Sequence, residues 1–75
     1  MQRIVVLGGG ESGVGSAILA KVKGFDVFLS DGGKLKESAK EMLGKWGIEW
    51  EEGNHSMEKI LNANEVIKSP GIPED

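Results

Sequence analysis

The sequence contains no cysteine and only one histidine, His55. Without cysteine the chain has no disulfide and no thiolate-ligated metal site, and a single imidazole has no second one with which to share a metal ion. We therefore expect no metal site, and we interpret His55 as a residue of a surface loop. The absence of cysteine also fits a reducing cytoplasm, which is the compartment we expect.

The sequence also lacks long hydrophobic runs and a large excess of charge of one sign. The apolar runs last only a few residues and no basic, apolar leader opens the chain, so we expect a soluble protein without a signal peptide or membrane span. The net charge is −3, and nine Lys and Arg residues are scattered among twelve Asp and Glu residues. Because nucleic-acid binding depends on clustered cations, this pattern argues against a nucleic-acid partner.

With 75 residues, the chain forms at most one small domain, and a domain of this size has marginal stability. We therefore expect nearly every apolar position to lie in the core. The last residues, SPGIPED, are turn formers without a further helix or strand, from which we expect the chain to be a piece of a longer protein. An exposed sheet edge in such a piece would favour self-association.

Glycine, in contrast, is abundant: twelve residues, five of them within LGGGESGVGS at residues 7–16. Before this stretch, the β-branched run RIVVL at residues 3–7 predicts a buried strand. After it, apolar residues at helical spacing predict a helix from residue 12 or 13 to about residue 23, closed by Gly24. The apolar residues of this helix are Val14, Ala17, Ile18 and Val22.

The rest of the chain alternates between the two patterns. Strands are predicted at residues 26–30, 48–51 and 65–68, and helices at residues 35–46 and 57–61. The apolar positions of these two helices are Leu35, Ala39, Met42, Leu43 and Trp46 in one and Met57, Ile60 and Leu61 in the other. Gly47 ends the longer helix, Ser56 is the predicted N-cap of the shorter one, and Lys59 faces solvent. The predicted fold is α/β: a Rossmann-like open parallel sheet of about four strands with flanking helices.

The glycines between the first strand and the first helix form Gly8-x-Gly10-x-x-Gly13, the spacing of a dinucleotide-binding turn. In that interpretation Gly8 makes the tight turn, Gly10 admits a ligand close to the backbone, and Gly13 lets the helix pack closely. The helix N-terminus then offers N–H groups to an anion. The alternative is that these glycines serve packing alone, and the overlap with Gly15 leaves the register of the pattern open.

Two further turns follow predicted strands. Asp31 lies 18 residues beyond Gly13, where such folds place a carboxylate that accepts hydrogen bonds from a ribose, although an aspartate before Gly-Gly also forms turns. Ser69-Pro70-Gly71 follows the last strand. Because the carboxyl ends of parallel strands border the ligand crevice, all three turns should face one site.

Other polar and aromatic residues carry less functional information. Glu11 places a negative charge inside the glycine turn, where it would repel a pyrophosphate or simply favour the helix dipole. Trp46 and Trp50 fall on apolar faces and are predicted core residues. Glu51 and Glu52 are adjacent on a strand and therefore point to opposite faces, which argues against a general acid/base pair.

Four stretches together resemble one known family. The residues IVVLGGGESGVGSA, the Asp31 turn, Gly53-Asn54-His55 and NEVIKSPGIP look like the N-terminal domain of the Mur ligases, over nearly the whole chain. Within that family, SPGIP resembles the branch that adds D-glutamate. The resemblance implies a cytoplasmic step of peptidoglycan synthesis, in which ATP phosphorylates the carboxylate of UDP-MurNAc-L-Ala and the amine of D-glutamate attacks the acyl phosphate.

The resemblance also implies a site. In that family the N-terminal domain holds the UDP part of the substrate, so the expected UDP-substrate-binding residues are Gly10, Glu11, Ser12, Gly13, Asp31, Gly32, Ser69, Pro70 and Gly71. Family members often carry a basic or hydroxyl residue after the aspartate, whereas Gly32-Gly33 follow it here. The ligand contact of that residue is therefore either absent from this chain or made by Lys34. The ATP-binding P-loop pattern GxxxxGK[ST] does not occur in this sequence. We therefore expect ATP and Mg²⁺ to belong to central and C-terminal domains absent from this chain, and we expect the chain alone to be inactive.

Three alternatives stay open at this point. The same glycines and Asp31 would serve an NAD-binding module of a dehydrogenase or regulatory protein. Another Mur ligase of the same pathway is a second alternative, because amino-acid specificity lies outside this segment. A scaffold whose glycine turn only packs is the third.

Overall fold

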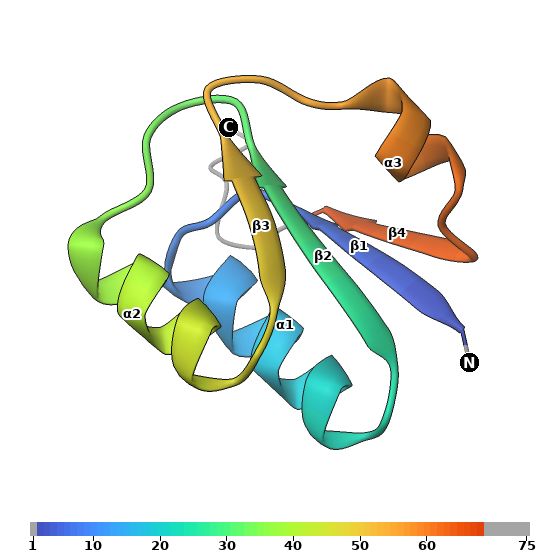
Figure 1. The fold of residues 1–75 in the computed structure, drawn as a ribbon, viewed down its shortest axis with the longest axis horizontal. Helices are drawn as coiled ribbons and strands as arrows, with labels where there is room; N and C mark the ends of the chain where they lie inside the picture. The colour runs from blue at the N-terminus through green and yellow to red at the C-terminus, as the bar shows by residue number, and fades with distance from the viewer. Residues whose placement is uncertain (1, 69–75) are drawn as a thin grey trace.

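The computed structural model describes residues 2–68 of the chain, which form a four-stranded sheet with helices on both faces (Figure 1). The elements follow in the order β1 (Arg3–Leu7), α1 (Glu11–Val22), β2 (Asp26–Asp31), α2 (Glu37–Lys45), β3 (Glu49–Glu52), α3 (Met57–Leu61) and β4 (Glu65–Lys68). All strand pairs are parallel and their order is β3-β2-β1-β4. The predicted α/β fold with an open parallel sheet is confirmed.

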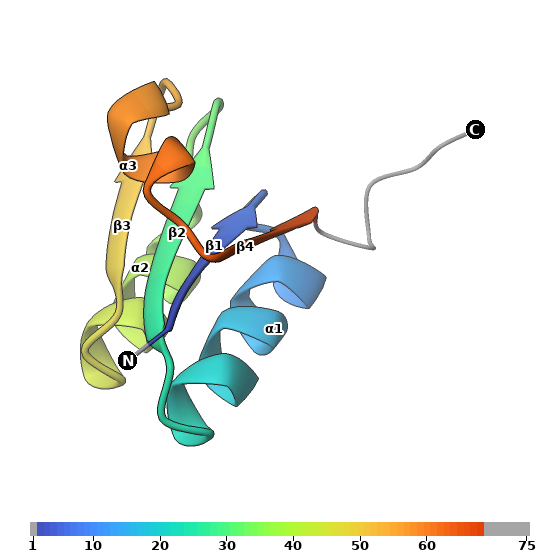
Figure 2. The ribbon, with the colours of Figure 1, turned by 90° about the vertical axis from the view of Figure 1, so that its right-hand side faces the viewer.

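The chain runs outward from β1 to β3 and then crosses back to β4 on the other side of β1. Figure 2, turned by 90°, shows α3 at the opposite side of the sheet from α1. The strand order therefore reverses at β1. In open α/β sheets a ligand crevice forms at this point, outside the carboxyl ends of the strands.

The main core lies between the sheet and helices α1 and α2. Alternate residues of the central strands, Ile4 and Val6 on β1 and Val27 and Leu29 on β2, point to this face and are buried. The helices contribute Val14, Ala17, Ala20, Ala39 and Leu43, and the loops contribute Leu35 and Ile48. The opposite face buries Val5 and Phe28, and the cations of Arg3 and Lys59 lie 5.4 and 5.1 Å from the centre of the Phe28 ring.

Both long helices end in the same way, as their glycines predict. Gly24 and Gly47 have φ of +94° and +69°, a left-handed conformation that residues with a Cβ rarely adopt. Their N–H groups donate to Lys21 O and Gly44 O, and the next residues, Phe25 and Ile48, donate to Ala20 O and Leu43 O. This is the Schellman arrangement, which satisfies carbonyl groups at the helix end.

Several predicted boundaries and core positions are wrong. Helix α1 begins one residue earlier than expected, at Glu11, and α2 begins at Glu37, because the buried Leu35 lies in the preceding loop. Ile48 likewise precedes β3. The expectation that nearly all apolar residues enter the core also fails: exposed large apolar side chains are Leu19, Val22, Met42, Trp46, Met57, Leu61 and Val66. Trp50 is half-buried and packs against the core.

Several of these exposed residues lie at helix positions that face away from the sheet or at a helix end. In α1, Ala20 takes the buried position and leaves Val22 on the outer side, 61% exposed. Trp46 is the C-cap of α2, one residue beyond the last helical position, and is 39% exposed. The helix α3 has only five residues, and only its Ile60 is even partly buried.

Candidate functional site

The glycine turn joins β1 to α1 at the carboxyl edge of the sheet. Gly8 has φ of +102°, which makes the tight turn that the sequence predicts, and its N–H donates to Ser30 O on β2 at 2.8 Å. Gly10 is the N-cap of α1 and no side chain caps this helix end. A Cβ on Gly10 would meet nothing within 4 Å, so the backbone here is open to a ligand. The N-terminal amides of α1 are thus available to an anion.

The close approach in this turn is made by Gly9, a residue that the three-glycine spacing leaves out. The Gly9 N–H donates to Asp31 Oδ2 at 2.7 Å. A Cβ on Gly9 would overlap the Leu35 Cδ2 methyl and would lie 3.0 Å from Asp31 Oδ2. Gly9 therefore lets the first turn touch the end of β2. The three consecutive glycines were the signal, but the sequence could not show which of them faces the neighbouring strand.

Asp31 ties two turns together. Its Oδ2 accepts from Gly9 and its Oδ1 accepts from the Gly33 N–H at 2.8 Å, which gives the turn-forming role considered for it. Each carboxylate oxygen has a second lone pair, so a hydrogen bond from a ligand hydroxyl remains compatible with this arrangement. That ligand contact stays a prediction.

A cavity of about 470 Å³ lies beside these turns, between α1 and α2. This volume is in the range of about 300–1,000 Å³ usual for small-molecule sites. It is lined by backbone of the glycine turn, apolar side chains of both helices, and charged groups at the rim: Gly9, Gly10, Glu11, Val14, Gly15, Ile18, Asp31, Lys34, Lys36, Ser38, Ala39 and Met42. Of the predicted site residues it brings together Gly10, Glu11 and Asp31, whereas Ser12, Gly13 and Gly32 do not line it.

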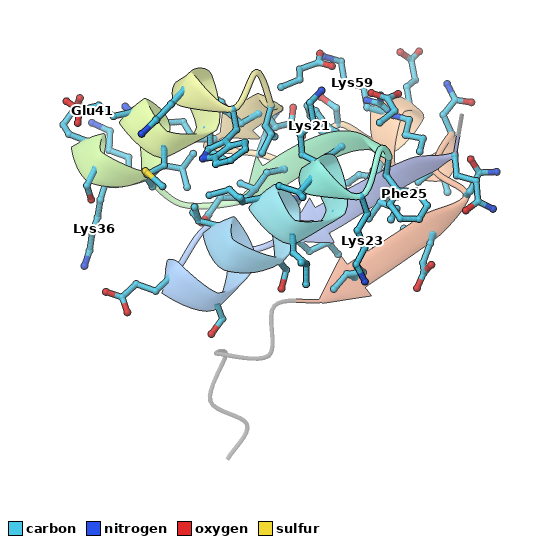
Figure 3. The ribbon with its side chains drawn as sticks, turned by 90° about the horizontal axis from the view of Figure 1, so that it is seen from below. Lys21, Lys23, Phe25, Lys36, Glu41 and Lys59 are labelled. Atoms are coloured by element: carbon cyan, nitrogen blue, oxygen red, sulfur yellow. The ribbon has the colours of Figure 1, made fainter. Side chains whose placement is uncertain are left out.

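Two lysine side chains line the cavity and would favour a negatively charged ligand. Lys34, the predicted substitute contact after the aspartate, lines it, and so does Lys36, which the sequence analysis missed. Figure 3 shows Lys36 at the end of the molecule where α1 begins, whereas Lys21 and Lys23 lie at the far end of α1. The spacing Lys34-x-Lys36 directly after a candidate ligand turn was the available signal.

A second polar cluster lies at the carboxyl ends of β2 and β3. The fully buried Ser30 Oγ lies 2.7 Å from Glu51 Oε2 and 2.7 Å from His55 Nδ1. Glu51 also accepts from the N–H and the hydroxyl of Ser56, both at 2.6 Å. Burial raises the pKa of Glu51, but these hydrogen bonds from Ser56 and Ser30 outweigh it and hold the pKa below its ordinary value. Ser56 is the N-cap of α3 as predicted, yet its hydroxyl serves Glu51 and not the helix end.

His55 is exposed, as expected of a loop residue, but its ring is fixed by this cluster. Glu52 points to the opposite face from Glu51, as predicted. It accepts from the Leu35 N–H at 2.8 Å and pairs with Lys40 at 3.2 Å. The Leu35 N–H is the main reason that the pKa of Glu52 lies below its ordinary value, and Lys40 adds to it. Glu52 therefore anchors the loop that carries Lys34.

The remaining predicted residues, Ser69, Pro70 and Gly71, lie outside the described residues and stay a prediction. Within residues 2–68, no three His, Asp or Glu side chains gather in a way that could hold a metal ion. The helices of this part of the chain are all too short or too polar to cross a membrane.

Comparison with known proteins gives a consistent result. The family described as the MurD N-terminal domain matches residues 3–75. A UDP-N-acetylmuramoylalanine–D-glutamate ligase from Bacteroides fragilis is 63% identical over 75 residues, which are 100% of this chain and 17% of that protein. The ligases of the same name from Bacteroides thetaiotaomicron and Chlorobium chlorochromatii are 61% and 42% identical, over 100% and 96% of this chain and 17% and 15% of those proteins. The chain thus spans about one sixth of the length of these relatives. No solved structure matches significantly.

Proposed function

The chain belongs to the MurD N-terminal domain family, and on this premise we propose that it is the substrate-nucleotide-binding part of the ligase that adds D-glutamate to UDP-MurNAc-L-Ala in peptidoglycan synthesis. The observation that carries the proposal is the cavity beside the glycine turn, which combines an open helix N-terminus, the Asp31 turn and two lysines. The relatives' name states a UDP-sugar substrate and D-glutamate. The match to the MurD family favours this branch over the other Mur ligases.

The features of the cavity fit the parts of such a ligand. The amides at the start of α1 suit the diphosphate, because a helix N-terminus carries partial positive charge and free N–H groups. Lys34 and Lys36 add charge on the same side. The apolar walls from Val14, Ile18 and Met42 suit the flat face of a base. Glu11, exposed in the first turn of α1, also lines the cavity and favours the helix dipole.

The proposed role of this chain is binding and orientation. The family's reaction needs ATP and Mg²⁺, but the described residues contain no suitable group of acidic side chains and the sequence lacks a P-loop. The residues present therefore do not fit an ATP–Mg²⁺ site. We assign that site, and the D-glutamate site, to the parts of the longer enzyme that this chain does not include, and we propose that the chain alone turns over no ATP and that the enzyme acts in the cytoplasm.

Amide NMR spectra of the 75-residue chain test this proposal. Addition of UDP-MurNAc-L-Ala should shift the signals of residues 8–13 and 31–36, and Lys34→Gln together with Lys36→Gln should weaken binding. Lys45→Gln, at the other end of α2, is the matched control and should leave binding unchanged. Addition of NAD to a separate sample tests the dinucleotide alternative, because the glycine turn and Asp31 would serve both ligands. Shifts with NAD and none with the UDP-sugar would overturn the proposal, and silence with both would favour a turn that only packs.

A further inference from the structure

The polar cluster of Ser30, Glu51, His55 and Ser56 is not explained by the cavity, although it lies next to the Asp31 turn. Ser30 is completely buried and directly precedes Asp31 on β2. Three groups lie within hydrogen-bond distance of Ser30 Oγ: Glu51 Oε2 and His55 Nδ1, each at 2.7 Å, and the Asn54 carbonyl oxygen at 3.4 Å. The positions of hydrogen atoms in this cluster follow from how many protons each group has.

The Ser30 hydroxyl has a single proton to donate. An ionised carboxylate accepts hydrogen bonds only, so at 2.7 Å the hydroxyl must donate to Glu51, and the Asn54 carbonyl is farther away. The contact between Ser30 Oγ and His55 Nδ1 then requires the proton to be on Nδ1. In neutral His55 the other ring nitrogen, Nε2, is therefore a bare hydrogen-bond acceptor.

This acceptor faces the turn of the candidate site. A Cβ placed on Gly32 would lie 3.2 Å from Nε2 and 3.7 and 3.9 Å from the two ring carbons beside it, so the nitrogen is the ring atom that points at Gly32. Because residue 32 has no side chain, none from this position covers Nε2, and His55 as a whole is exposed. Within residues 2–68 no group of the protein donates a hydrogen bond to Nε2, whereas both oxygens of Asp31 already accept from backbone amides.

We propose that His55, which does not itself line the cavity, contacts the ligand at the neighbouring turn after β2, where its Nε2 accepts a hydrogen bond from an N–H or O–H group of the UDP-sugar. The inference rests on the proposed function and deepens it. Glu51 and Ser30 act through His55: they hold the ring with Nδ1 as donor, so that Nε2 is presented as acceptor beside Gly32. The ligand group is the imide N–H of the base or a hydroxyl of the ribose or amino sugar.

The tautomer and the contact are measurable directly, because His55 is the only histidine of the chain. A long-range proton–nitrogen NMR spectrum of the labelled chain, recorded on the singly protonated ring, should show Nδ1 protonated and Nε2 bare. Saturation with UDP-MurNAc-L-Ala should move the Nε2 resonance and leave Nδ1 protonated. A shift with UMP as well places the donor in the nucleotide, and a shift with the UDP-sugar alone places it in the sugar. An unmoved Nε2 at saturation overturns the proposal.

Two substitutions separate contact from structural support. His55→Asn keeps an amide N–H near the position of Nδ1 but lacks Nε2, and His55→Gln carries an amide oxygen to the position of Nε2. Loss of one hydrogen bond should lower the affinity of His55→Asn about fivefold, while His55→Gln retains most of it. The reverse order would mean that His55 only supports Ser30, and equal affinities would mean that it contributes nothing; either result refutes the proposal.

Gly32→Ala provides a second and independent variant. Its methyl group would occupy the space in front of Nε2 at 3.2 Å, so it should weaken UDP-sugar binding and shift the Nε2 signal without ligand. Glu58→Gln, exposed on the neighbouring α3, is the control. Failure of the unsubstituted chain to bind the UDP-sugar would overturn the proposed function and this inference together. Binding that all His55 variants share would overturn only the inference.

Discussion

Replacement of Gly9 by alanine is the most direct test of how the candidate site is built. The added methyl group would overlap the Leu35 side chain and approach Asp31 Oδ2 to 3.0 Å and the Leu29 Cδ2 methyl to 3.3 Å. Leu35 cannot simply swing aside, because it is only 6% exposed and packs within the core. The glycine turn must therefore move away from the end of β2, and the Gly9–Asp31 hydrogen bond lengthens or breaks.

The expected size follows from two contributions. Overpacking of a close-packed site costs about 1–3 kcal/mol, and a hydrogen bond to a charged group contributes about 1.5–3 kcal/mol when it is lost. Because the two contributions overlap, we expect Gly9→Ala to lower the free energy of unfolding by about 2–4 kcal/mol. A domain of this length has only about 4–11 kcal/mol in total. With a urea dependence near 1 kcal/mol per molar, the denaturation midpoint should fall by about 2–4 M.

Gly10→Ala is the matched control, since it makes the same chemical change one residue away. Gly10 has φ of −70° and a Cβ there would meet nothing within 4 Å, so Gly10→Ala should lower the free energy of unfolding only by the difference between glycine and alanine at an N-cap, about 0.5–1 kcal/mol. Urea denaturation followed by circular dichroism compares the two. Equal midpoints would show that the contact of Gly9 with the end of β2 is not what holds the turn.

Other predictions concern the surroundings of the site. Gly44 lies inside α2 with open space around its Cβ, so Gly44→Ala should stabilise the chain by about 0.5–1 kcal/mol, whereas Gly47→Ala, at φ of +69°, should destabilise it by about 1–2 kcal/mol; thermal melting of both variants checks the opposite signs. Leu43 is fully buried, and Leu43→Ala should cost about 2–5 kcal/mol in urea denaturation, with no loss meaning that the core re-forms around the cavity. The pKa of Glu51 is lowered in the folded chain. Its contribution to the free energy of unfolding is therefore complete above the ordinary carboxyl pKa of 4.5. This contribution is lost as the pH falls below that value, because the unfolded chain takes up the proton first. Glu51→Gln should therefore make the free energy of unfolding less dependent on pH in the acid range, and an unchanged acid limb would argue against these hydrogen bonds.

Periodicity was sufficient to predict the order of the elements and the parallel sheet. The β-branched run at β1 and the apolar alternation around Trp50 are strong local signals, and Gly24 and Gly47 mark helix ends because few other residues adopt positive φ. Periodicity was insufficient for Leu35 and Trp46. Both match the helical spacing of α2, but one lies before the helix and the other at its C-cap, and only tertiary contacts decide where a helix begins and ends.

For the candidate site too, the sequence predicts some features, whereas others depend on tertiary contacts. A turn of glycines after a buried strand and an aspartate after the next strand indicate where a ligand would lie, because parallel strands bring their carboxyl ends to one edge. The choice of Gly9 as the contact glycine depends on the position of Leu35, which no local pattern encodes. The link between Ser30 and His55 spans 25 residues and depends on strand register, so the lone histidine was interpreted only as a loop residue.

The central position of β1 has a consequence for how the chain acquires its structure. Arg3 pairs with Asp26, 23 residues away, and with Asn64, 61 residues away. During synthesis the β1–α1–β2 unit can assemble as soon as it leaves the ribosome, whereas the other edge of β1 stays open until β4 arrives. Closing that long loop is the entropically expensive step. Pairing of β4 with the free edge of β1 is thus expected to be a late event in the folding of this sheet.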